Sequence, residues 1–86
     1  MKRSDITDAQ VCEAYRRWRA ECPYGKTAEV HLMEMTGAPI KVAYAAMERA
    51  SDRDLVNYGV SLRTGWLTEK GLALLETVAR DHVPTL

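Results

Sequence analysis

Apolar residues recur at helical spacing in the first part of the chain. Thr7 can cap a helix with its hydroxyl, and Gln10 three positions later completes a capping-box pattern. Pro23 and Gly25 end the segment and turn the chain. The apolar positions recur at i, i+4, i+7 and i+11, and they are Val11, Tyr15, Trp18 and Cys22. This pattern predicts an amphipathic helix that buries a single stripe.

A second, shorter helix is predicted for residues 28–36, with Thr27 as its N-cap and Gly37 as its stop. Its inward candidates are Val30, Leu32 and Met33, with His31 at the rim. A third helix follows, for which Pro39 suits the first position because its missing N–H would have had no partner there. Its expected buried face is Ile40, Ala43, Tyr44, Met47 and Ala50, and the opposite face carries Lys41, Val42, Ala45, Glu48, Arg49 and Asp52. Two helices joined by Thr36-Gly37-Ala38 have the form of a helix-turn-helix, a form that many helical hairpins share.

The next segment has the features of a short β-hairpin. Residues 55–58 contain strand-forming side chains, and residues 64–67 can form the return strand. The tip is expected within residues 60–63, and a tighter turn at Arg63-Thr64-Gly65 is the alternative. Because an isolated hairpin is only marginally stable in water, Trp66 and Leu67 are expected to anchor it on the helices.

A last helix is predicted to begin at Thr68, whose hydroxyl can cap it, with Glu69 in the first turn. Gly71 would allow this turn to pack closely against the hairpin. The expected inward stripe is Leu72, Leu75, Val78 and Ala79, with Leu74 at its edge. The tail from Asp81 through Pro84 is expected to fray.

Composition indicates one small globular domain. The 86 residues are 47% hydrophobic and 28% charged, and no apolar run approaches the roughly 20 residues that cross a bilayer. The N-terminal segment MKRSDITDAQ lacks the apolar stretch of a secretory signal, so a cytoplasmic protein is expected. Ten helical residues, about 15 Å, separate Cys12 from Cys22, too far for a disulfide.

The sequence lacks the common motifs of catalysis and metal binding. The spacings among Cys12, Cys22, His31 and His82 match no ligand pattern. The sequence contains no recognisable nucleophile–base pair and no phosphate-cradling glycine loop. We therefore expect neither an enzyme nor a bound metal or cofactor.

The run AMERASDRDLVNYGVSLRTGWLTEKGLALL, residues 45–75, resembles the core of winged helix-turn-helix domains. In regulators of the MarR-like type, the segment that leads from the wing into the next helix is often similar to WLTEKG at 66–71. The short chain is also similar in size to small regulators and accessory proteins of bacteriophages and prophages. The resemblance implies a mainly α fold with a small β-hairpin, in which residues 1–86 form one winged helix-turn-helix domain with short flexible ends. Its elements would be three helices, a two-stranded wing and a C-terminal helix.

The resemblance also implies a transcription regulator that binds double-stranded DNA. The third helix would enter the major groove, and the wing would reach neighbouring phosphates or the minor groove. Matched to the recognition helix are Ala38, Lys41, Val42, Ala45, Glu48 and Arg49; matched to the wing are Ser61 and Arg63. Lys26 and Thr27 could approach the DNA backbone at the start of the second helix, where free N–H groups favour phosphate.

Charge argues against strong DNA binding. The net charge is zero, and residues 38–66 carry four basic and three acidic side chains, while DNA binding depends on several Lys or Arg contacts to phosphate. A homodimer would double the contacts, and the first and last helices, with Trp18 or Leu74, are its candidate surfaces. The alternative is a winged-helix module that binds a host or phage protein through the charge-poor strip Val42, Ala45 and Ala46.

Overall fold

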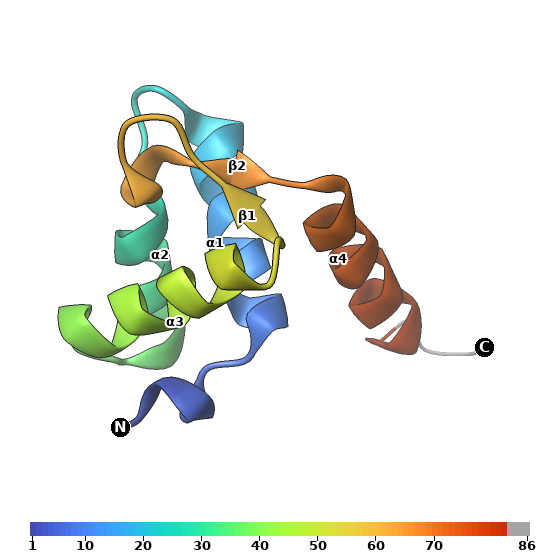
Figure 1. The fold of residues 1–86 in the computed structure, drawn as a ribbon, viewed down its shortest axis with the longest axis horizontal. Coiled ribbons are helices and arrows are strands. Elements are labelled where there is room, and N and C mark those ends of the chain that lie inside the picture. Colours follow the sequence, from blue (N-terminus) through green and yellow to red (C-terminus); the bar gives the residue numbers. More distant parts are fainter. Residues whose placement is uncertain (83–86) are drawn as a thin grey trace.

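The computed structural model describes the backbone of residues 1–82 and the side chains of residues 1–78, and it is mainly helical with one small hairpin (Figure 1). The elements in chain order are η1 (Arg3–Asp5), α1 (Asp8–Glu21), α2 (Ala28–Thr36), α3 (Ile40–Asp52), β1 (Val56–Asn57), η2 (Leu62–Thr64), β2 (Trp66–Leu67) and α4 (Glu69–His82). The tail was expected to fray from Asp81 through Pro84, but Asp81 and His82 lie in α4, and residues 83–84 lie outside the described part. None of the helices described has both the length and the apolar character needed to cross a membrane.

Local capping signals explain where the first helices begin and end. The Thr7 hydroxyl accepts the N–H of Gln10 at 3.1 Å, and the Gln10 side chain accepts the N–H of Thr7 at 2.9 Å, which confirms the predicted capping box. Gly37 ends α2 with a left-handed φ of 75° and donates its N–H to the carbonyl of Met33. This conformation is easily accessible to glycine, and the predicted bounds of α2 are confirmed.

The core lies between α1, α2, α3 and the hairpin, and α1 contacts all of these elements and α4. Val11, Tyr15 and Trp18 are buried on α1 as predicted. Cys22 is exposed, and its placement in the buried stripe is wrong because α1 ends at Glu21, before the stripe reaches it. His31 is buried and not at the rim.

The buried face of α3 is made almost entirely of small side chains. Ala43, Ala46, Met47 and Ala50 are fully buried, so this helix approaches the core closely. The prediction of Ile40 as a core residue is wrong, because Ile40 is 38% exposed in the first turn, whereas Tyr44 is half-buried and packs against the core. The buried stripe is rotated toward Ala46, so the assignment of Ala46 to a partner-binding strip with Val42 and Ala45 is wrong.

The hairpin is a two-stranded antiparallel pair in which Val56 faces Leu67 and Asn57 faces Trp66. Leu55, Val56 and Leu62 are its buried anchors, and Leu67 packs against the core as expected. Trp66 is 41% exposed, so its prediction as an anchor is wrong. Trp66 and Leu67 are neighbours in β2 and point to opposite faces of the strand, and Leu67 is the one that points inward.

The start of α4 is fixed against the hairpin. Thr68 caps α4 by accepting the N–H of Gly71 at 3.1 Å. A Cβ on Gly71 would lie 2.2 Å from the carbonyl oxygen of Leu55, so the predicted close packing is confirmed. Beyond this turn α4 extends away from α2 and α3 (Figure 1). Leu74 and Leu75 pack on the core, whereas Leu72 is 50% exposed, contrary to prediction; the side chain of Ala79 lies outside the described part.

Candidate nucleic-acid interface

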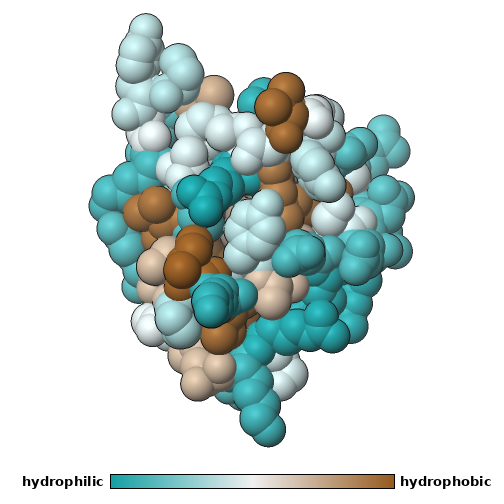
Figure 2. Space-filling model, turned by 60° about the vertical axis from the view of Figure 1, so that its left-hand side comes forward, coloured by the Kyte–Doolittle hydropathy of each residue, from teal (hydrophilic) through white to brown (hydrophobic). Residues whose placement is uncertain are grey.

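The outer face of α3 and the segment η2 of the hairpin loop border one shallow hollow of about 330 Å³. Its walls are Ile40, Lys41, Tyr44 and Glu48 from α3 and Arg63 from η2. Ile40, Tyr44 and Glu48 are spaced i, i+4 and i+8, so they form one row along the helix surface. Figure 2 turns the side of the hairpin loop toward the viewer and shows hydrophobic and hydrophilic residues interleaved there.

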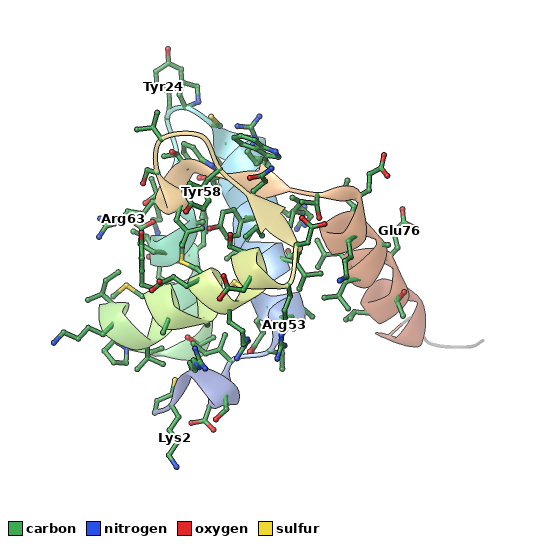
Figure 3. All side chains as sticks on the ribbon, in the orientation of Figure 1. Lys2, Tyr24, Arg53, Tyr58, Arg63 and Glu76 are labelled. Carbon is green, nitrogen blue, oxygen red and sulfur yellow. The ribbon has the colours of Figure 1, made fainter. Side chains whose placement is uncertain are left out.

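Arg63, in the hairpin loop, contacts side chains of both α2 and α3. Its guanidinium lies 5.9 Å from the centre of the Tyr44 ring, within the range of a cation–π contact. Its Nη1 lies 3.8 Å from Oε1 of Glu29, on α2. Figure 3 shows Arg63 at the edge of the molecule between the hairpin and α3, and its side chain remains 52% exposed. A ligand anion could therefore reach it.

Two side chains of α1 fix the backbone that carries Arg63. The Tyr15 hydroxyl donates to the carbonyl of Leu62, and the Trp18 indole N–H donates to the carbonyl of Gly65 at 3.1 Å. Burial raises the pKa of Tyr15, so its hydroxyl keeps the proton that it donates. Both hydrogen bonds join residues 47 positions apart in the sequence, and they hold the hairpin loop on α1.

Lys41 lies in the first turn of α3, on the same hollow as Arg63. It is exposed, and its ammonium forms no ion pair with the side chains described. Glu48, one of the predicted contact residues, is also exposed and borders the hollow two turns further along the helix. Lys41, Glu48 and Arg63 are thus the three predicted site residues that the structure brings together.

Arg49 is used inside the chain. Its Nε lies 3.0 Å from Asp8, its Nη1 donates to the carbonyl of Arg3 at 2.8 Å, and its Nη2 donates to the carbonyl of Ile6. The side chain is only 13% exposed. Its assignment to the contact surface is therefore corrected: this arginine fastens the N-terminal segment to α3. Ala38 is also removed from that surface, because it is 3% exposed in the core.

The start of α2 does not offer the free phosphate site expected from Lys26 and Thr27. The Lys26 ammonium pairs with Glu34 at 2.7 Å. The Thr27 hydroxyl makes no cap; it donates to Oε1 of Glu29 at 2.6 Å. The Glu29 carboxylate thus places negative charge beside this helix N-terminus, which disfavours a phosphate there.

The remaining predicted residues have supporting positions. Val42 and Ala45 are half-buried on the flank of α3. Ser61 is half-buried, and its Oγ accepts the N–H of Arg63 at 3.3 Å, which shapes the turn that presents Arg63. We place none of the three on the hollow.

Several exposed apolar and aromatic residues near this surface were missed by the sequence reasoning. Tyr58 is 44% exposed, Val60 is fully exposed and Trp66 is 41% exposed, all on or beside the hairpin (Figure 3 labels Tyr58). Helical spacing placed Ile40 and Tyr44 on one face, but it could not show that both border a surface hollow.

A second, larger groove of about 830 Å³ lies between α1 and α4. Leu72, Leu75 and Val78 of α4 line it, with Met35 of α2. Arg16 and Arg17 border it on α1, and Glu76 borders it on α4.

No protein-family model, no curated protein and no solved structure was found to match this chain.

Proposed function

We propose that the protein binds double-stranded DNA as a small winged helix-turn-helix regulator, with the outer row of α3 and the hairpin loop as its contact surface. The observation that carries the proposal is that Lys41 and Arg63, from two separate elements, border the same exposed hollow. A helix that presents cations next to a protruding hairpin can contact phosphates on both sides of a groove. The order α2, glycine turn, α3 and hairpin further supports it.

The charges on this surface set the expected strength of binding. Among the residues described, the proposed contact surface carries two cations: Lys41, which forms no ion pair, and Arg63, which is half exposed and lies 3.8 Å from Glu29. The affinity of one copy is therefore modest and depends on salt with a slope of about two, since each phosphate contact releases close to one counterion.

A salt series with a random-sequence duplex tests this proposal by fluorescence anisotropy. We expect binding below about 50 mM salt that weakens as salt rises, and Lys41→Ala or Arg63→Ala should each reduce the slope by about one unit. Lys2→Ala is the matched control, because Lys2 is an exposed cation at the opposite end of the molecule from the hairpin (Figure 3). A slope that is equal in all three variants would contradict the proposed surface.

A second candidate function, a module that binds another protein, is supported by the exposed apolar and aromatic groups. Ile40 borders the hollow with Arg63, Tyr58, Val60 and Trp66 are exposed on the hairpin, and interface hot spots are rich in aromatic residues and arginine. The same titration separates the two candidates. Absence of binding to duplex DNA at low salt would reject the DNA proposal and leave the protein-binding module.

A further inference from the structure

Glu29 is a buried carboxylate whose charge is poorly compensated. It lies in the first turn of α2 and is only 5% exposed. Its Oε1 accepts a hydrogen bond from the Thr27 hydroxyl at 2.6 Å, whereas its Oε2 has no hydrogen-bond partner among the described residues. A buried carboxylate with one oxygen unpaired is expensive, and a nearby cation reduces the cost.

Arg63 is the cation that the structure provides. The 3.8 Å between its Nη1 and Oε1 of Glu29 exceeds a hydrogen bond, so the contact is a charge attraction without directional bonding. No other basic side chain in the described part lies within ion-pair distance of Glu29. The Tyr44 ring faces the same guanidinium and stabilises it in this inward position.

The burial of Glu29 distinguishes this pair from Lys26 and Glu34, whose side chains are each more than half exposed. Water and salt screen an exposed pair, so a phosphate replaces its acid at little cost. Glu29 is only 5% exposed, whereas Arg63 is 52% exposed, so solvent screens this pair on the arginine side alone. If Arg63 turns toward a ligand, the carboxylate loses its counter-charge without gaining water in return.

We propose that Glu29 is an internal competitor that restrains Arg63 and weakens the binding of an anionic ligand at the hollow. The ion contact is autoinhibitory: binding of a DNA phosphate by Arg63 requires that the guanidinium loosen its attraction to Glu29. This inference rests on the proposed DNA binding and names a restraint built into the same site.

Glu29→Gln tests the restraint, because it removes the charge and keeps the shape and the oxygen that accepts from Thr27. With a random-sequence duplex at low salt, we expect this variant to bind about three- to tenfold more tightly than the wild type, the size typical of a partly exposed charge pair. The salt slope should remain about two, because Arg63 contacts phosphate in both proteins and only the cost of loosening it from Glu29 changes. In an Arg63→Gln background, Glu29→Gln should change the affinity by less than about twofold.

Glu48→Gln is the matched control. It removes the same charge from a residue that borders the hollow with Arg63, and Glu48 forms no ion pair with the residues described. Removal of the Glu48 charge changes the DNA affinity through long-range electrostatics, so the change should persist in the Arg63→Gln background. If Glu29→Gln unfolds the protein, as circular dichroism would show, Glu29→Met takes its place in the same cycle.

The outcomes separate the inference from the proposed function. Tighter binding that disappears with Arg63→Gln supports the restraint. The restraint is overturned if the wild type binds DNA and Glu29→Gln leaves its affinity unchanged or lowers it. It is also overturned if the gain in affinity persists in the Arg63→Gln background. Both results agree with DNA binding. Absence of binding by both the wild type and Glu29→Gln overturns both.

Discussion

Arg49 closes the N-terminal segment onto α3. One guanidinium contacts the Asp8 carboxylate and two backbone carbonyls, of Arg3 and Ile6, and so ties η1 and the start of α1 to the third helix. Asp8, whose side chain is 20% exposed, also pairs with Arg53. Removal of Arg49 would leave two carbonyls without this donor and weaken the compensation of a largely buried acid.

We expect Arg49→Ala to lower the free energy of unfolding by about 2–3 kcal/mol, because several charge-assisted bonds of low exposure are lost together. Urea unfolding followed by circular dichroism measures the change. Arg19→Ala is the control, since Arg19 is exposed and forms no ion pair with the described side chains, and it should change stability by less than about 0.5 kcal/mol. A stable Arg49→Ala protein with weakened DNA binding would return Arg49 to the contact surface.

The helices were predictable because their signals are local. The Thr7–Gln10 box and Gly37 act within one turn of chain, and they predicted the start of α1 and the end of α2 correctly. The contact between Tyr44 and Arg63 was not predictable, because the two residues come from distant parts of the chain. The same holds for Arg49, whose partners lie more than 40 positions away. The sequence thus indicated where the elements lie, but not which of their polar side chains remain free.

Element α1 carries an ion-pair network that makes its stability depend on pH. Arg16 donates to Glu13 from Nε at 2.7 Å and also from Nη2, and Arg17 donates at 3.3 Å. The hydrogen bonds from Arg16, followed by its charge and the contacts of Arg17, hold the pKa of Glu13 below its usual 4.5. A group whose pKa is lower in the folded state stabilises the fold above the unfolded pKa and loses this contribution as pH falls toward the folded pKa.

We therefore expect the wild type to lose slightly more stability than Glu13→Gln when the pH falls from about 5.5 to 3. The difference should remain below about 1 kcal/mol, because both arginines are about half exposed and solvent screens them. Thermal unfolding at several pH values measures it. Glu48 forms no ion pair in the described part, so Glu48→Gln should lose as much stability as the wild type when the pH falls. If the network contributed nothing, Glu13→Gln would lose the same amount as well.

At the scale of the whole molecule, the groove between α1 and α4 offers a way to raise the affinity of the proposed DNA binding. Two cations in each copy give modest affinity, and a two-fold dimer doubles them on a symmetric site. The groove has an apolar floor, and Leu72 beside it is 50% exposed. Its α1 wall carries Arg16 and Arg17 with Glu13, one positive charge in excess, and its α4 wall carries Glu76.

We expect a second copy of this chain to occupy that groove, because a two-fold axis would place the acidic α4 wall of each copy on the basic α1 wall of the other. A net charge of zero leaves no overall repulsion to oppose the pairing. At about 100 µM, light scattering after size exclusion should report twice the 9.7 kDa chain mass, and Leu72→Glu should restore the single mass without changing the helix content. Tyr24→Glu is the control: it adds the same charge at a residue that is 96% exposed and lies away from α4 (Figure 3), and it should remain dimeric. A wild-type protein that elutes at the mass of one chain would show that the groove does not hold a second copy, and the salt dependence of DNA binding would then describe a monomer.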